Sequence, residues 1–343
     1  MTGILTDRLA ERGWLLADGA TGTNYFAMGL RSGEPPENWN IDRPEKVREL
    51  HRRFIAAGAD IILSNSFGGN RRRLMLHGAS SQAAEVNRLA ADHARAEADS
   101  APRPILVAGS MGPTGDLLQP LGDVTREEAL EAFAEQARAL AEGGADMLWI
   151  ETLSSEEEAS AAAEAAAATG LPVVVTLSFD TGGRTMMGIK PEDWPSVAER
   201  LPAPLAGFGA NCGVGAAELV ATILGIARTA PDSAVIVAKG NCGVPEMIDG
   251  EVRYSGTPAL MADYVRMARD AGARIIGGCC GTTPEHLQAM RAALESHTPG
   301  PPPGIDEIAA KLGQVSRLAR GIDAAAEAKK RRQAGSNQNS SIG

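Results

Sequence analysis

Short runs of apolar residues recur along the chain, and each is followed by a turn and then by a longer stretch with helical periodicity. The runs are nearly continuous in apolar character, which is typical of parallel strands buried on both faces. They predict eight strands: Trp14–Asp18, Asp60–Ser64, Pro104–Ala108, Asp146–Ile150, Pro172–Leu177, Leu205–Ala210, Ala234–Lys239 and Arg274–Gly278.

The segments between these runs carry the start and stop signals of helices. Thr125 and Glu128 have the spacing of a capping box, and Gly58 and Gly272 stand just before a strand, where a helix ends. Eight strands alternating with helices predict an α/β fold, a single (β/α)₈ TIM barrel over residues 1–297. A doubly wound open sheet is the alternative, but the number of units favours the barrel.

The composition changes after residue 297. Residues 298–304 form a Pro-rich linker, and residues 305–318 form a short amphipathic segment that could pack on the barrel or on a partner. The basic and polar end that follows is typical of a solvated, disordered tail rather than a binding site. We therefore expect residues 298–343 to comprise a linker, a short helix and a disordered tail.

The charge balance narrows the set of partners. The 343-residue chain has 33 Lys and Arg against 43 Asp and Glu, a formal net charge of −10, and no broad basic stripe, which argues against a nucleic-acid partner. It has no apolar run of the roughly 18 residues that a membrane span requires, and its first residues lack the pattern of a signal peptide. We expect a cytoplasmic protein with no membrane partner, and oligomerisation is compatible with the sequence.

All four cysteines follow the ends of the sixth, seventh and eighth predicted strands: Cys212, Cys242, Cys279 and Cys280. Because the C-terminal strand ends of a barrel converge, these thiols should face one another. The chain lacks the closely spaced cysteine pair typical of structural zinc sites, whereas three thiolates would leave one tetrahedral zinc position open. Glycines around the adjacent pair permit the sharp turn that both thiols need to reach one ion. Inert buried thiols and a redox disulfide are the alternatives.

Two other strand ends carry carboxylates. The first strand ends in DGATGT, Asp18–Thr23, which combines a carboxylate with backbone N–H groups and hydroxyls suited to both ends of an amino acid. A tight turn is the alternative interpretation. Glu151 ends the fourth strand and has no cationic neighbour in the sequence. It is a candidate to bind the ammonium group of a substrate, with a helix N-cap as the alternative.

These motifs resemble those of the homocysteine S-methyltransferases, which comprise betaine–homocysteine and S-methylmethionine–homocysteine methyltransferases and the homocysteine modules of cobalamin-dependent methionine synthases. The resemblance covers residues 10–296. It rests on DGATGT (Asp18–Thr23), SNSF (Ser64–Phe67), ET (Glu151-Thr152), GANC (Gly209–Cys212) and GGCCGTTPEH (Gly277–His286).

The resemblance implies methyl transfer to the thiol of homocysteine, giving methionine. It also implies a zinc ion bound by Cys212, Cys279 and Cys280, and an amino group held by Asp18 and Glu151. Zinc lowers the pKa of a bound thiol, so no protein nucleophile is needed and we expect no catalytic residue beyond the zinc site. The expected substrate-binding residues are Asp18, Gly19, Thr21, Trp39, Glu151 and Asn211.

Two classes of methyl donor are compatible with the resemblance. Betaine-dependent relatives surround a quaternary ammonium with aromatic rings, and Trp39 matches one of them. Two tyrosines of that pattern are missing, because Gly68 or Gly69 and Thr152 stand in their places. The stretches around Glu151 and Cys212 look closer to the homocysteine module of cobalamin-dependent synthases. The donor is therefore either methylcobalamin on a separate corrinoid partner protein, or betaine or another onium compound.

Cys242 departs from the family pattern, which usually has Ala at this position. It could close the zinc shell as a fourth thiolate, but the charge of such a shell would resist an incoming anionic thiolate. We therefore favour a small, partly buried residue that points away from the metal. Two other function classes stay open: a phosphate-binding or Schiff-base aldolase-type barrel enzyme that uses Lys239, and a non-catalytic zinc-binding protein.

Overall fold

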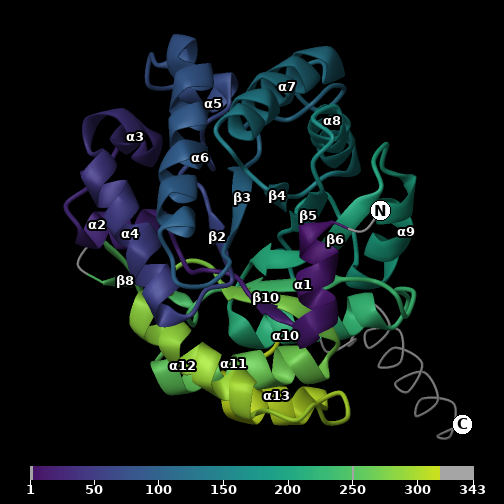
Figure 1. The fold of residues 1–343 in the computed structure, drawn as a ribbon. Helices are drawn as coiled ribbons and strands as arrows, with labels where there is room; N and C mark the ends of the chain where they lie inside the picture. The colour runs from purple at the N-terminus through teal and green to yellow at the C-terminus, as the bar shows by residue number, and fades with distance from the viewer. Residues whose placement is uncertain (1–2, 249–250, 317–343) are drawn as a thin grey trace, which may run out of the picture.

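Eight parallel strands form a barrel at the centre of the computed structural model, which describes residues 3–248 and 251–316 (Figure 1). Their order around the sheet is β1–β10–β7–β6–β5–β4–β3–β2, and a parallel bridge between Ala17 and Ile61 joins β1 to β2. The predicted single (β/α)₈ barrel is confirmed. The barrel strands are β1 (Leu15–Leu16), β2 (Ile61–Leu63), β3 (Leu106–Met111), β4 (Met147–Leu153), β5 (Val173–Leu177), β6 (Leu205–Cys212), β7 (Ile236–Gly240) and β10 (Ala273–Gly278).

Helices surround the barrel and begin where their capping residues predict. Thr125 and Glu128 form the expected capping box of α7, and the Ser155 side chain caps α8. No helix in residues 3–248 and 251–316 is both long and apolar enough to cross a membrane. The helices are α1 (Ile4–Arg12), α2 (Gly22–Ala27), α3 (Trp39–Asp42), α4 (Pro44–Ala57), α5 (Arg71–Met75), α6 (Ala83–Asp99), α7 (Arg126–Glu142), α8 (Glu156–Ala167), α9 (Trp194–Arg200), α10 (Ala216–Ala227), α11 (Pro258–Asp270), α12 (Pro284–Ser296) and α13 (Ile305–Leu312).

The core has two layers, because successive side chains of a strand point to opposite faces. Leu16 belongs to the layer between the strands and the helices, whereas Leu15 belongs to the layer inside the barrel. The inner layer also contains Leu5 and Leu9 of α1, both 2% exposed. Helix α1 was not among the predicted elements, and it supplies apolar side chains to the interior of the barrel.

The junction between β1 and β2 uses two buried aspartate side chains. The backbone of this junction contributes the bonds from Asp60 N to Leu16 O (2.7 Å) and from Asp18 N to Ile61 O (2.9 Å). Asp60 Oδ2 accepts a bond from Leu16 N at 3.0 Å, and Asp18 Oδ2 accepts one from Leu63 N at 2.8 Å. Each carboxylate therefore accepts a hydrogen bond from a strand N–H group. In a longer pair of strands, a backbone carbonyl of the neighbouring strand would accept that bond.

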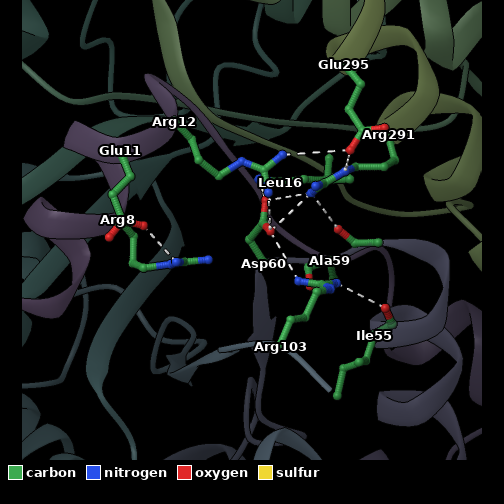
Figure 2. Close-up of polar contacts among 11 residues, drawn as sticks. Arg8, Glu11, Arg12, Leu16, Ile55, Ala59, Asp60, Arg103, Arg291 and Glu295 are labelled. Atoms are coloured by element: carbon green, nitrogen blue, oxygen red, sulfur yellow. Dashed lines mark hydrogen bonds and ion pairs between the residues drawn. The ribbon is translucent and has the colours of Figure 1, made fainter. Parts of the chain in front are cut away.

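Three arginines from distant parts of the chain converge on Asp60, as Figure 2 shows. Its carboxylate lies 3.6 Å from Arg12, 3.2 Å from Arg103 and 3.0 Å from Arg291, and Asp60 is only 2% exposed. Arg12 and Arg291 also stack on the ring of Trp14, with guanidinium carbons 4.8 and 5.2 Å from the ring centroid. One buried carboxylate thus links α1, the segment before β3, and α12 to the β1–β2 junction.

Two further segments pack around the barrel. The hairpin of β8 (Pro245–Ile248) and β9 (Glu251–Tyr254) follows β7 and was not predicted. Helix α13 falls in the expected amphipathic segment, and it packs on α10 and α11 at the lower edge of Figure 1, with Ile308 fully buried. The segment was expected to pack either on the barrel or on a partner, and in the structure α13 packs on the helices of the barrel. The expected disordered tail lies outside the described residues.

We predict that Asp60→Ala lowers the free energy of unfolding by about 3–5 kcal/mol, because it leaves three arginines without their shared, buried carboxylate. Chemical denaturation of the two proteins measures this loss. Glu295→Gln is the matched control: Glu295 pairs with Arg291 at 2.7 Å but is 54% exposed, so its removal should cost less than about 1 kcal/mol. Equal stabilities of Asp60→Ala and Glu295→Gln would contradict the role assigned to Asp60.

Candidate functional site

The C-terminal ends of the barrel strands surround a cavity of about 560 Å³. Of the residues predicted to bind substrate or metal, it is lined by Gly19, Thr21, Glu151, Cys212, Cys279 and Cys280. Its wall also contains residues outside the expected substrate-binding and metal-binding sets, among them Phe26, Glu37, Phe67, Arg73, Ser110, Thr152 and Lys239.

Three thiols meet in this cavity. The sulfur atoms of Cys212, Cys279 and Cys280 all lie within 4.8 Å of one another, and in the described part of the chain they are the only such group of potential metal ligands. Cys212 ends β6 with a left-handed φ of 60°, and Gly281 has a φ of 79° just after the adjacent pair. These turns aim the three side chains at one point, as the flanking glycines predict.

Two asparagines contact the segments that carry the thiols. Asn241 Oδ1 accepts a bond from Cys280 N at 3.0 Å, and Asn241 Nδ2 donates to Gly213 O at 2.8 Å. Asn241 therefore ties the turn that carries Cys280 to the residue that follows Cys212. The side chain of Asn211 lies 4.0 Å from the sulfur of Cys279. It thus contacts a potential metal ligand rather than lining the cavity itself.

A repeated motif could have identified Asn241 from the sequence. The letters NCGV occur twice, at residues 211–214 after β6 and at residues 241–244 after β7. The two copies use their cysteines differently. Cys212 joins the thiol group, whereas Cys242 is fully buried and faces Gly256, where an added Cβ would lie 2.7 Å from its sulfur. Burial also raises the pKa of Cys242 to about 11.

Hydrogen bonds within the thiol group shift the pKa values of its members in opposite directions. Hydrogen bonds from Cys212 and Cys279 lower the pKa of Cys280, whereas hydrogen bonds with Cys279 and Cys280 raise the pKa of Cys212. The Tyr254 hydroxyl also donates to Cys280, and its ring lies against Gly281. Tyr254 was not among the expected site residues, because it belongs to β9 of the unpredicted β8–β9 hairpin. Cys280 is thus the thiol most easily ionised in the group.

A carboxylate stands at the end of β4 beside the thiols. Glu151 is 7% exposed, and its Oε1 accepts a bond from the Ser110 hydroxyl at 2.5 Å. Burial raises its pKa, and the charge of Lys239 partly offsets this effect. The next residue, Thr152, has a left-handed φ of 67° and bonds twice to Asn211, at 2.8 and 2.7 Å. These bonds hold an irregular strand end, and the cavity wall includes both Glu151 and Thr152.

A buried ion pair lies beside Glu151. Lys239 Nζ is 3.4 Å from Asp18 Oδ1 and 3.4 Å from the carbonyl oxygen of Gly19. Burial raises the pKa of Asp18 to about 6, although Lys239 acts in the opposite direction. Burial alone would lower the pKa of Lys239, but the charges of Asp18 and Glu151 outweigh it and raise that pKa. A lysine held in its charged form is a poor Schiff-base nucleophile, so this pair disfavours the aldolase-type alternative.

The structure does not bring Trp39 into this group. Trp39 is 5% exposed and packs on Tyr25, with ring centroids 5.1 Å apart. It lines a separate surface cavity together with Arg31 and Arg43 rather than the one that contains the thiols. Large aromatic residues are often placed by core packing, and a motif position cannot distinguish that use from ligand binding.

Comparison with known proteins identifies the family of this chain and supports its fold. The family model for homocysteine S-methyltransferase matches residues 15–294, which include the whole barrel. Among solved structures, the chain is similar to the metallated form of the homocysteine methyltransferase MmuM from Escherichia coli. The two are 24% identical with a TM-score of 0.71, over 84% of this chain and 99% of that one. The oxidised form of the same enzyme is 25% identical with a TM-score of 0.70, over 83% and 97% of the two chains.

The family match covers most of the chain and contains all three clustered cysteines as well as Asp18 and Glu151. The chain therefore belongs to the homocysteine S-methyltransferase family.

Proposed function

We propose that this protein catalyses zinc-dependent methyl transfer from a small onium carboxylate to the thiol of homocysteine, giving methionine. The observation that carries the proposal is the convergence of three thiols on one wall of a cavity that also contains Glu151. Sulfur ligands and a nearby carboxylate suit the two ends of this substrate, which has a thiol at one end and an ammonium group at the other.

The thiol group fits a zinc ion. Zinc–sulfur bonds of about 2.3 Å in a tetrahedral shell require sulfur atoms about 3.8 Å apart, and the three thiols lie within 4.8 Å of one another. Three protein ligands leave the fourth position for a substrate sulfur, as in catalytic zinc sites. A zinc ion bound there would lower the pKa of the homocysteine thiol, which makes it a nucleophile at neutral pH.

The remaining residues hold and orient the substrate. Glu151 accepts the substrate ammonium, and Ser110 fixes the carboxylate that does so. Asn211 and Asn241 keep Cys279 and Cys280 in place through contacts to the side chain of one and the backbone of the other. Because the chain supplies no nucleophile of its own to the reaction, holding the thiol and the methyl carbon in line is its main contribution to the rate.

The cavity wall favours an onium donor over a corrinoid protein. The wall contains the rings of Phe26 and Phe67, the carboxylate of Glu37 and the guanidinium of Arg73. Aromatic faces and a carboxylate attract an onium cation, and an arginine suits an attached carboxylate. Arg73 lies over the Phe67 ring at 5.8 Å, so a donor carrying both charges would meet both partners side by side.

A methylation assay with homocysteine tests this proposal. We expect methionine to form with at least one of betaine, dimethylsulfoniopropionate and S-methylmethionine, each of which carries an onium group and a carboxylate. Methylcobalamin should give no turnover above background. Activity with methylcobalamin alone would assign the reaction to a corrinoid partner, and no methionine with any donor would refute the proposed activity.

The metal assignment predicts different outcomes for two cysteines. Cys280→Ala should lose most bound zinc and most activity, because two thiolates remain to hold the ion. Cys242→Ala should retain about one zinc per chain and most activity, because its thiol faces Gly256 instead. Metal analysis of the purified variants measures both. Full zinc content in Cys280→Ala, or loss of zinc in Cys242→Ala, would contradict the assigned ligand set.

The orientation of homocysteine predicts a selective effect of Glu151→Gln. The variant should bind homocysteine about 10–100 times more weakly, since a charge-assisted hydrogen bond contributes about 1.5–3 kcal/mol. Its zinc content should stay unchanged. Calorimetric titration of the zinc-loaded protein gives the affinity for homocysteine. An unchanged affinity would show that Glu151 has only a structural role.

A further inference from the structure

We infer that Lys239 binds the α-carboxylate of the amino-acid substrate and so selects a zwitterion over a simple thiol or amine. This inference rests on the proposed function, because it concerns how homocysteine lies in the same cavity. From the sequence, Lys239 had a role only in the aldolase-type alternative.

Lys239 is placed for this task by the barrel. It lies near the end of β7, in register with Asn211 of β6 and Gly277 of β10. The side chain is 4% exposed, yet it forms part of the wall of the cavity that contains the thiols. An ammonium group in that wall is a buried cation that a bound ligand can reach.

The existing contacts of Lys239 leave it able to bind another acceptor. Its distances to Asp18 Oδ1 and to the carbonyl oxygen of Gly19 are both 3.4 Å, longer than the roughly 2.7–2.9 Å of a strong charge-assisted bond. An ammonium group has three donors, and these two long contacts occupy at most two of them. Asp18 Oδ1 is itself buried without a hydrogen bond in the structure.

The two partners match the two charges of an α-amino acid. The ammonium and carboxylate groups of the substrate are attached to the same carbon, so the groups that bind them must be neighbours. Asp18 Oδ1 has only its long ion-pair contact with Lys239 and no hydrogen bond, and the Lys239 ammonium has a donor to spare. With the substrate ammonium at Asp18 and Glu151, and its carboxylate at Lys239, each charge in the site contacts charges of the opposite sign.

A second cation of the cavity wall is assigned to the other substrate. Arg73 lies over Phe67, and its charge acts on Glu37, both of which belong to the proposed donor region. Lys239 instead pairs with Asp18, and the charge of Glu151 also acts on it; these are the carboxylates assigned to homocysteine. The two cations thus serve two different carboxylates.

Lys239→Met tests the inference when it is titrated with homocysteine and with two of its analogues. Homocysteamine lacks the α-carboxylate, and γ-mercaptobutyrate lacks the amino group. In the zinc-loaded protein, Lys239→Met should weaken homocysteine binding about 10–100 times, as expected for loss of a charge-assisted bond. It should leave the affinity for homocysteamine within about a factor of two of the wild type, since a neutral side chain loses nothing toward a ligand without a carboxylate.

Glu151→Gln and Lys239→Arg are the matched controls. Glu151→Gln should weaken homocysteine and homocysteamine but spare γ-mercaptobutyrate, which is the opposite selectivity. Lys239→Arg keeps the charge and should restore much of the homocysteine affinity. If Lys239→Met weakens homocysteine and homocysteamine equally, or neither of them, Lys239 is only a structural counter-ion of Asp18 and the inference is wrong.

A second pair of variants tests the same inference if Lys239→Met does not fold. Asp18→Asn/Lys239→Met removes both charges of the buried pair, and its affinities are compared with those of Asp18→Asn alone. A further loss for homocysteine but not for homocysteamine supports the inference, and equal losses overturn it. Failure of the wild-type protein to bind homocysteine at all would instead refute the proposed function.

Discussion

Closure of the barrel between β1 and β2 is the constraint on which the rest of the molecule depends. β1 has only two residues, so its backbone cannot form a long ladder with β2. The side chains of Asp18 and Asp60 supply the missing acceptors, one at each end of the junction. Three arginines pair with the carboxylate of Asp60 and so offset the free-energy cost of burying its charge. Two of them, Arg12 and Arg291, also link α1 and α12 to the junction.

The same closure builds the site. Asp18 accepts a strand bond with one carboxylate oxygen and faces Lys239 with the other, while its carbonyl oxygen accepts a bond from Gly278 N at 3.0 Å. The turn that carries Cys279 and Cys280 begins directly after Gly278. Fold and site are therefore coupled through one residue. The carboxylates of Asp18 and Glu151 outnumber the one ammonium group, of Lys239, on which their charges act. Such a site favours a ligand that brings an ammonium group.

Local patterns predicted those features that a short stretch of chain decides. The eight strands were visible because each is a run of apolar residues flanked by turn or helix signals, and parallel strands are buried on both faces. The thiols were predicted to meet because cysteines at consecutive strand ends must converge in a barrel. Helix α1, the β8–β9 hairpin and Tyr254 were missed, since their place depends on packing against the finished barrel.

By itself, then, the sequence determined the barrel, the group of clustered cysteines and the carboxylates at the strand ends, because periodicity and position along a strand carry that information. Only the tertiary structure decided among residues of the same type. It turned Cys212 toward the other thiols and Cys242 toward Gly256, it placed Trp39 on Tyr25, and it set Lys239 beside Asp18. The physical reason is that side-chain partners come from segments far apart in the chain, so charge pairing and close packing are settled only when the barrel closes.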